Sequence, residues 1–280
     1  MKLVRYGQKG SEKPGLLDAD GNLRDLSHEF SDFSADSMTA QALQAIKDLD
    51  IKNLPVVDGK PRLGVPLTGI GKLVCIGLNY SDHAKELGAD IPSEPVVFMK
   101  ATSSLTGPFD DIRLPRDSTR TDWEVELAIV IGDAASYVSE EDAIKHVAGF
   151  STFIDLSERD FQNKRGGQWT KGKSCDTFGP LGPWIVTRDE IMDPQRLSLW
   201  LEVDGRRKQY GNTELMIFGV SQIVSYVSQF MTLHPGDVIA TGTPPGVGAG
   251  MDPPEYLRAG NRIDAGVDGL GNQSHFVVGA

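Results

Sequence analysis

The chain has 280 residues, of which 39% are hydrophobic and 24% are charged, and its mean hydropathy is -0.24. This composition supports a substantial core in one large domain, with or without a small appendage, and no stretch approaches the roughly 20 apolar residues of a membrane helix. A formal net charge of -11 argues against binding to nucleic acid and to anionic membranes.

Two further features set the expected compartment. Cys75 and Cys175 are the two cysteines of the chain, and their wide separation predicts free thiols rather than a disulfide. The opening residues Met1–Tyr6 lack the pattern of a signal peptide. We therefore expect a cytoplasmic protein with no nucleic-acid or membrane partner.

Residues 1–68 predict a small N-terminal domain. Two strand-like pieces precede an amphipathic helix in which Leu43, Ile46 and Leu49 repeat at helical spacing. The strand pieces are Met1–Tyr6 and Gly15–Leu17. The Pro- and Gly-rich stretch 56–66 predicts a linker to a second domain, residues 69–280.

Residues 69–280 predict a mostly β domain, so the expected fold class is α+β. The expected strands are Leu73–Gly77, Val96–Lys100, Trp123–Ile131, Ser151–Asp155, Trp184–Thr187, Leu197–Val203, Asp237–Thr241 and Ser274–Val278. Helices are expected at Glu140–His146, capped by Ser139, and at about Val220–Thr232. Asp204-Gly205 predicts a hairpin turn.

The segment after the first of these strands carries a candidate catalytic pair. His83 and Glu86 lie three residues apart, so on one helical turn they share a face and can form a hydrogen bond. A carboxylate that holds a neutral imidazole in one tautomer makes it a competent general base for water. Such pairs are also common on helix surfaces, and this alternative stays open.

The strand expected at Trp123–Ile131 places two carboxylates on the same side. Because side chains alternate along a strand, Glu124 and Glu126 point the same way. Their face continues with Ala128 and Val130, so it changes from charged to apolar. This change places the pair at the mouth of a buried region. The alternative is two solvated glutamates on an edge strand.

A third carboxylate, Asp155, ends the apolar run Phe150–Ile154. If Asp155 converges with Glu124 and Glu126, the three hard oxygen ligands suit Mg²⁺, Mn²⁺ or Ca²⁺ better than zinc. Such a site leaves positions open for water or substrate, which indicates catalysis.

Positive charge is concentrated after Asp155 in an otherwise acidic chain. The cationic residues of the segment 159–173 are Arg159, Lys164, Arg165, Lys171 and Lys173. A solvated loop accounts for Lys164 and Arg165, whereas a lysine near a metal, as Lys173 would be, can donate to an oxyanion or a carboxylate. The segment predicts a small anionic substrate.

The last candidate is the Gly- and Pro-rich loop at residues 240–250. No Gly-Lys-Ser/Thr follows it, and its glycines miss the dinucleotide spacing, so it is not a phosphate loop. Thr243 either faces the substrate or belongs to a plain tight turn. The chain also lacks a Gly-x-Ser-x-Gly elbow, which disfavours a covalent acyl-enzyme.

Five short motifs follow one another in this chain. They are Gly77-Leu78-Asn79-Tyr80 with His83 and Glu86, Trp123-Glu124-Val125-Glu126, Asp155 with Arg159-Asp160 and Gln162, Gly172-Lys173-Ser174, and Thr241-Gly242-Thr243-Pro244. Together, over about residues 70–280, they resemble the fumarylacetoacetate hydrolase family. The opening residues 2–14 further resemble members that act on 2,4-diketo-3-deoxy sugar acids, such as the L-rhamnonate derivative, or as ureidoglycolate lyase.

The resemblance implies a β-roll of mixed, coiled sheets with a small N-terminal α/β domain, and a homodimer. Its implied roles are catalysis by His83, Glu86 and Lys173, Mg²⁺ binding by Glu124, Glu126 and Asp155, and substrate binding by Tyr80, Arg159, Gln162 and Thr243. It also implies a lid from His83 to about Pro95. Cys175 departs from the family pattern, in which many members have Phe, and this difference affects the expected shape of the pocket.

The implied reaction is hydrolysis of the C3–C4 bond of a 2,4-diketo acid, which yields pyruvate and a carboxylic acid such as lactate. The same metal site also suits ureidoglycolate lyase, decarboxylase or isomerase chemistry. A non-catalytic dicarboxylate-binding protein is the alternative from another class, and the His83/Glu86 pair speaks against it.

Overall fold

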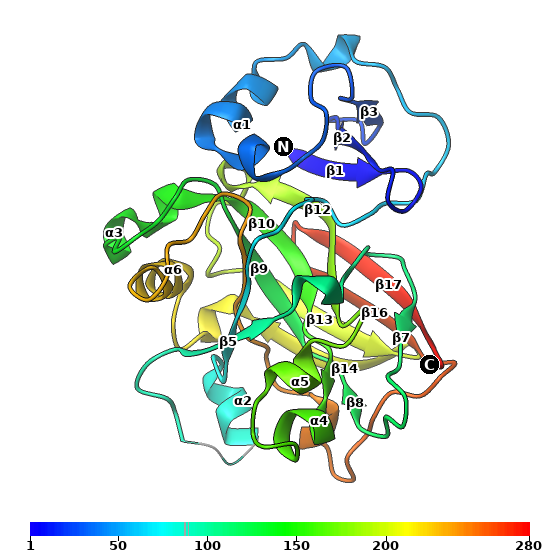
Figure 1. Ribbon diagram of the computed structural model, residues 1–280, viewed down its shortest axis with the longest axis vertical. Coiled ribbons are helices and arrows are strands. Elements are labelled where there is room, and N and C mark those ends of the chain that lie inside the picture. Colours follow the sequence, from blue (N-terminus) through cyan, green and yellow to red (C-terminus); the bar gives the residue numbers. More distant parts are fainter. Residues whose placement is uncertain (87, 89) are drawn as a thin grey trace.

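The computed structural model describes residues 1–86, 88 and 90–280, and most of its regular structure is β-strand (Figure 1). Its strands are β1 Lys2–Tyr6, β2 Lys13–Leu17, β3 Leu23–Asp25, β4 Leu73–Gly77, β5 Val96–Lys100, β6 Leu105–Thr106, β7 Ile112–Arg113, β8 Thr121–Asp122, β9 Val125–Ile131, β10 Val147–Ile154, β11 Ser157–Glu158, β12 Gly179–Thr187, β13 Ser198–Val203, β14 Arg206–Asn212, β15 Val238–Ala240, β16 Arg262–Val267 and β17 Gly271–Val278. Its α-helices are α1 Ala40–Lys47, α2 Ser81–Glu86, α3 Glu140–Ala143, α4 Arg159–Asn163, α5 Thr170–Lys173 and α6 Val220–Ser228.

A large mixed sheet forms the body of the molecule. Its strands follow the order β3-β2-β1-β12-β10-β9-β15-β4-β5, and β6 adds to β12. Most neighbours are antiparallel, but β15 pairs in parallel with β4. A second sheet has the order β14-β13-β16-β17-β7, and β8 pairs with β11 in a short third sheet. The predicted mostly β fold with mixed sheets is confirmed.

Strand β9 is buried on both of its faces, which follows from its apolar sequence. Trp123, Val125 and Leu127 belong to one hydrophobic core, whereas Ala128 and Val130 belong to the other. The predicted alternation is therefore correct, and it continues toward the start of β9 as Glu124 and Glu126. Both carboxylates are fixed by a strand that packs on two sides, so their positions are rigid.

The first 68 residues contain β1–β3 and α1, and they do not form a separate sheet. Strand β1 pairs with β12 in the large sheet, with Leu3 opposite Ile185. Helix α1 begins after Thr39, whose side chain accepts a hydrogen bond from the Ala42 amide. The division into domains at residue 68 stays a prediction. Strands from both sides of this boundary belong to the same sheet.

The other elements expected from the sequence are largely present. Asp204 and Gly205 turn between β13 and β14 with positive φ angles of 50° and 71°, as a tight hairpin requires. Helix α6 ends at Ser228, four residues before the predicted end. Both cysteines are free. None of the helices among the described residues combines the length and the apolar character needed to cross a bilayer.

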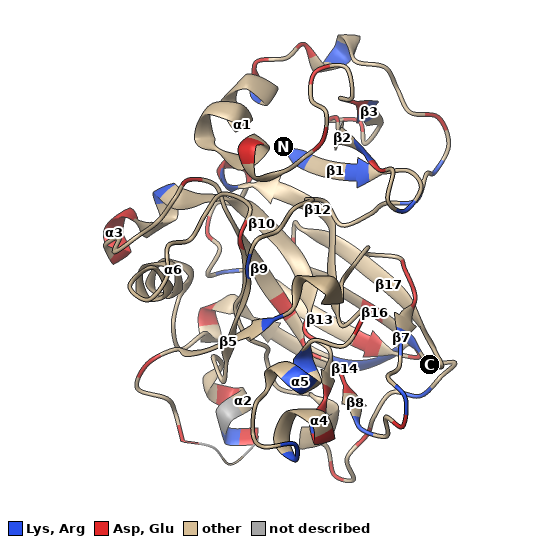
Figure 2. Ribbon diagram, viewed as in Figure 1, with Lys and Arg blue, Asp and Glu red and all other residues tan. Residues whose placement is uncertain are grey.

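One end of the molecule gathers the short elements that carry most of the predicted site residues. Helices α2, α4 and α5 and strand β8 lie at the end opposite β1–β3 (Figure 1). Figure 2 shows Lys and Arg positions in blue on α5 and close to α4. The predicted site is therefore distant from the N-terminal strands.

Candidate active site

Three carboxylates converge beside a cavity of about 200 Å³ at this end of the molecule. Glu126 lies at the start of β9, Glu124 directly precedes that strand, and Asp155 directly follows the neighbouring strand β10. One oxygen of each carboxylate lies within 4.8 Å of the others, and all three residues are buried. The convergence predicted from the sequence is present.

Two buried lysines balance part of this negative charge. Lys173 Nζ donates to Glu124 Oε2 and to Asp155 Oδ2, at 2.6 Å each. Lys100 Nζ, at the end of β5, donates to Asp155 Oδ1 at 2.6 Å. We did not predict Lys100 from the sequence, although a lone lysine that ends an apolar strand is the same signal that marked Asp155.

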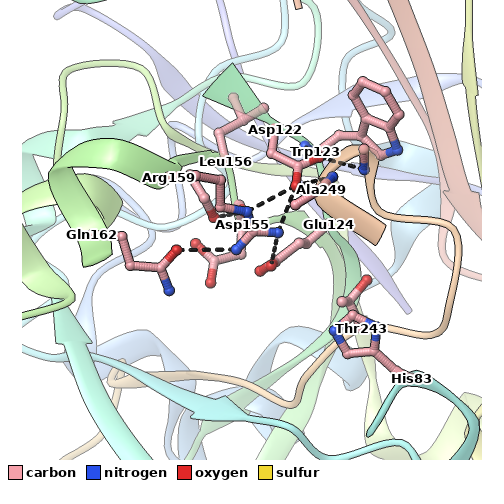
Figure 3. Close-up of polar contacts among 12 residues, drawn as sticks. His83, Asp122, Trp123, Glu124, Asp155, Leu156, Arg159, Gln162, Thr243 and Ala249 are labelled. Atoms are coloured by element: carbon pink, nitrogen blue, oxygen red, sulfur yellow. Dashed lines mark hydrogen bonds and ion pairs between the residues drawn. The ribbon is translucent and has the colours of Figure 1, made fainter. Parts of the chain in front are cut away.

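Arg159 adds a third cation to the cluster (Figure 3). Its Nη2 donates to Glu124 Oε1 at 2.7 Å, and its Nη1 donates to Gln162 Oε1 at 3.1 Å. Both residues lie on α4, where a carboxylate at the helix start, Glu158, accepts from the Asp160 amide. The structure thus brings together Arg159, Gln162 and Lys173, as the sequence predicts.

The pKa values of Glu124 and Glu126 shift in opposite directions. Burial opposes ionisation of Glu124, but Lys173 and Arg159 outweigh it and lower the pKa of Glu124 to about 2. Burial, followed by the charges of Asp155 and Glu124, raises the pKa of Glu126 well above its ordinary value. The cluster therefore holds one carboxyl group that its own cations leave unstabilised.

The surroundings of Glu126 fit a metal ligand. Among the described residues its side chain has no cationic partner, and its one hydrogen bond comes from the Gly242 amide at 2.8 Å. Gly242 has a φ of 97°, and a side chain there would meet Asn79, so only glycine brings this amide so close. A divalent cation bound by oxygen ligands would relieve the uncompensated charge, and the all-carboxylate donor set fits Mg²⁺, Mn²⁺ or Ca²⁺.

His83 and Glu86 form the hydrogen-bonded pair that their spacing predicts. His83 Nδ1 lies 2.8 Å from Glu86 Oε2, and the imidazole is 4% exposed and lines the cavity. The amide of Gly246 donates to Glu86 Oε1 at 2.8 Å, which fixes the carboxylate from its other side. The predicted lid from His83 to about Pro95 includes residues 87 and 89, which lie outside the described residues, and it stays a prediction.

Thr243 lies at the cavity, whereas Tyr80 lies in the hydrophobic core. Thr243 lines the cavity, but its hydroxyl donates to the Val125 carbonyl oxygen and accepts from Gln209 Nε2. The Tyr80 ring is fully buried in the hydrophobic core and is not among the residues that line the cavity, and its predicted contact with substrate stays a prediction. Leu78 lines the cavity instead, with a φ of 52° that turns the chain just after β4.

Apolar side chains form the wall that faces the carboxylates. Ile76, Phe98 and Trp169 line the cavity, and the rings of Phe98 and Trp169 meet edge to face at 5.2 Å. Lys164 and Arg165, from the same basic segment as Lys173, are exposed, as the solvated-loop alternative predicts. The cavity therefore combines a charged floor with a hydrophobic wall, which is typical of a small-molecule site.

Comparison with known proteins agrees with this geometry. The family model for the fumarylacetoacetate hydrolase C-terminal region matches residues 72–278. A protein of Burkholderia ambifaria that bears the name "putative hydrolase" is 56% identical over 274 residues, covering 98% of this chain and 97% of the relative. The structure of a fumarylacetoacetate hydrolase from Exiguobacterium antarcticum aligns with a TM-score of 0.90 at 38% identity, covering 100% of both chains.

A second solved structure carries ligands. It is maleylpyruvate hydrolase from Sphingobium sp. SYK-6, in complex with manganese(II) and pyruvate, which aligns with a TM-score of 0.84 at 27% identity over 100% of both chains. The family model covers most of this chain, and the relatives at 38% and 56% identity cover nearly all of it. The chain therefore belongs to the fumarylacetoacetate hydrolase family.

Proposed function

We propose that this protein is a metal-dependent hydrolase that cleaves the C3–C4 bond of a 2,4-diketo acid and releases pyruvate and a carboxylic acid. The observation that carries the proposal is the presence of a His83–Glu86 pair and a cluster of three carboxylates on one cavity. The first would supply a base for water, and the second would hold a divalent cation that a keto acid can chelate. The neighbour solved with manganese(II) and pyruvate supports the same assignment.

The reaction needs a proton acceptor for water. His83, held by Glu86, takes a proton from water as the water oxygen forms a bond to C4, and the π pair of the C4 carbonyl passes to its own oxygen. When this oxygen re-forms the carbonyl of the carboxylic acid, the C3–C4 bond breaks, its electron pair becomes that of the pyruvate enolate, and C3 takes up the proton that His83 removed from water. A divalent cation held by Glu124, Glu126 and Asp155 would act as a Lewis acid that stabilises the enolate charge.

The charge of the cavity favours a monoanionic group at the metal. Three cations, Lys100, Arg159 and Lys173, contact the carboxylates of Asp122, Glu124 and Asp155. The fourth carboxylate, Glu126, lies beside them without a cationic partner among the described residues. One negative charge is left over, so a divalent cation makes the cluster positive by one unit. The carboxylate of a 2-keto acid then restores neutrality, which is the balance that burial demands.

We propose a 2,4-diketo-3-deoxy sugar acid, such as the L-rhamnonate derivative, as the first substrate to test. The C4 substituent would extend from the charged floor past Leu78 and along the hydrophobic wall, which includes Phe98 and Trp169. Arg120 and Asn163 also line the cavity and offer hydrogen-bond donors for hydroxyl groups. We further propose Mg²⁺ as the metal.

The test is a substrate panel with purified protein and Mg²⁺. Acylpyruvates, 2,4-diketo-3-deoxy sugar acids, oxaloacetate and ureidoglycolate are incubated in turn, and the products are identified by proton NMR. We expect pyruvate and an equimolar carboxylic acid from the diketo acids, with loss of turnover after chelation of the metal. The His28→Ala variant, which changes an exposed histidine, serves as the control for His83→Ala.

The other outcomes separate the alternatives. Glyoxylate and urea from ureidoglycolate would replace the hydrolase by the lyase, and pyruvate from oxaloacetate alone would replace it by a decarboxylase. Binding of an acylpyruvate with Mg²⁺ but without any product would favour the non-catalytic binder.

A further inference from the structure

Asp122 is a buried carboxylate beside the cavity that the proposed reaction does not use. It is fully buried and does not line the cavity, so it touches no substrate. Its carboxylate nevertheless accepts hydrogen bonds from the amides of Trp123, Gly248 and Ala249, and from the Arg159 side chain. A buried carboxylate with this many hydrogen-bond partners restricts the orientation of the groups that donate to it.

The first group that Asp122 fixes is the guanidinium of Arg159. Arg159 Nε donates to Asp122 Oδ2 at 2.8 Å, and Nη2 lies 2.7 Å from the same oxygen. These contacts set the plane of the guanidinium, because its donors form a rigid fork. Figure 3 shows the fork between Asp122 and Glu124, with Gln162 on the remaining side.

The orientation of Arg159 in turn decides which end of the Gln162 amide faces the cavity. Arg159 Nη1 carries only hydrogen-bond donors, so the Gln162 atom 3.1 Å away must be the oxygen. The amide NH₂ of Gln162 is then left as a donor on a residue that lines the cavity and is 5% exposed. Asp122 thus orients, through Arg159, a donor suited to an anionic substrate.

The second group that Asp122 fixes is the loop 246–250. The Gly248 and Ala249 amides donate to the two oxygens of Asp122, at 2.6 and 3.0 Å. Ala249 lines the cavity, and Gly246, at the start of this loop, donates to the Glu86 carboxylate. One carboxylate therefore connects Arg159, in the charged floor of the cavity, to the loop that contacts the His83–Glu86 pair.

We propose that Asp122 is a positioning residue that aims Arg159 and the Gln162 amide at the carboxylate or oxyanion of a 2-keto acid. This proposal rests on the proposed function, because it names how the same cavity recognises its anionic substrate. It assigns to Asp122 an effect on substrate affinity that is transmitted through Arg159. A carboxylate that served only to stabilise the fold would act independently of Arg159.

The test is a double-mutant cycle with Asp122→Asn and Arg159→Met. The asparagine keeps the volume of Asp122, but it loses the charge and can turn a donor toward Arg159. We expect Asp122→Asn to raise KM about 10- to 100-fold with a smaller change in kcat, because a charge-assisted contact is lost. In the Arg159→Met background the same substitution should change KM less than about 2-fold.

Asp237→Asn is the matched control. Asp237 is equally buried, accepts from the amides of Lys72 and His234, and does not line the cavity. This variant should lose thermal stability without a change in KM. Equal KM effects of Asp122→Asn in both Arg159 backgrounds, or an unchanged KM in the single variant, would overturn the proposal.

Two further measurements keep the proposal testable. If Asp122→Asn does not fold, Arg159→Lys retains the charge but not the fork, and it should raise KM about as strongly; an unchanged KM would overturn the proposal. Calorimetric binding of pyruvate with Mg²⁺ is measured for each variant as well. If the wild type binds pyruvate but cleaves none of the diketo acids, the proposed function alone is refuted. Weaker pyruvate binding by Asp122→Asn would then still support the positioning role. Absence of pyruvate binding by the wild type refutes both.

Discussion

Two clusters of buried or partly buried charge in this molecule use the same residue types and differ in how completely they are balanced. In the first, near the N-terminal strands, Arg62 donates to both oxygens of Asp110, at 2.7 and 2.6 Å, and to Glu12 at 2.8 Å. Burial opposes ionisation of Glu12 and Asp110, but Arg62, together with backbone amides and other nearby cations, outweighs it, and the pKa of each carboxyl is lowered. In the second, the active-site cluster, the pKa of Glu126 is raised.

This difference in pKa shifts indicates a stabilising role for the Arg62 cluster and a ligand-binding role for the second cluster. The Arg62 cluster satisfies its carboxylates with protein partners, so nothing is gained by adding a ligand. The active-site cluster leaves one carboxyl without a cationic partner among the described residues, and it lies beside a cavity. Unbalanced charge at a cavity is costly for folding and is retained where a ligand completes it.

The largest expected effect is that of Glu126→Gln. The variant should lose Mg²⁺ binding and about 10³-fold or more of the turnover, because a charged ligand is replaced by a neutral amide. The metal-free variant should unfold at the same temperature as the wild type or higher, because an uncompensated buried carboxyl is gone. Calorimetric metal titration, turnover assays and thermal unfolding check the three parts.

Glu12→Gln is the matched control for that experiment. It changes a largely buried glutamate in the Arg62 cluster, so it should lower the unfolding temperature and leave turnover unchanged. Full metal binding by Glu126→Gln, or lost turnover in Glu12→Gln, would remove the distinction between the clusters.

The next largest effect is expected from His83→Ala. Loss of general-base assistance should reduce kcat by about 10²- to 10⁴-fold, whereas Mg²⁺ affinity should stay within about 2-fold of the wild type. Stopped assays for kcat and metal titration measure the two quantities. Near-normal kcat in this variant would show that another group activates water.

The sequence predicted the parts of the site that are encoded by local period. Alternation along β9 is a two-residue pattern, and it placed Glu124 and Glu126 on one face before any pairing was known. The same alternation places Asp122 on that face, two residues before Glu124, although no role was predicted for it. The two-residue spacing of Asp122, Glu124 and Glu126 is sufficient to predict that all three side chains share a face.

Other parts of the site depend on contacts that no local pattern encodes. Lys100 reaches Asp155 only because β5 pairs with β4, with Lys100 opposite Leu73, and β4 lies in the same sheet as β9 and β10. Helices α2 and α4 have six and five residues, too few for a helical period to be read. The loop after β4 turns Leu78 rather than Tyr80 into the cavity through one positive φ angle, which composition does not reveal.

A moderate effect on stability, without an effect on catalysis, is expected from Arg62→Gln. Its loss leaves Asp110 and Glu12 without their main partner and should cost about 2 kcal/mol, at the lower end for a broken buried pair because Arg62 is partly exposed. For a chain of this size that corresponds to a fall of roughly 4–8 °C in Tm. Lost turnover at 25 °C in a folded variant would contradict the prediction.

The Arg62 cluster also predicts the sign of a pH dependence. Because the folded pKa of Glu12 and of Asp110 is depressed, their contribution is present above the unfolded pKa of about 4 and is lost as the pH falls through the lower folded values. Wild-type stability should therefore fall on acidification below about pH 4.5, and the stability of Arg62→Gln should fall less steeply. Parallel denaturant titrations at several pH values measure the difference.

The smallest effect is expected from Lys164→Ala, in the same basic segment as Lys173. Lys164 Nζ lies 3.0 Å from Asp160 Oδ1, but its side chain is 65% exposed, whereas that of Lys173 is 3% exposed. Water screens the exposed pair, so its loss should change the free energy of unfolding by less than about 0.5 kcal/mol and KM by less than about 2-fold. Asp160 retains its contact with Arg120, so the cavity rim keeps its local charge pair. A large rise in KM would place Lys164 in the recognition of substrate, and burial would then no longer separate the functional from the solvated lysines of this segment.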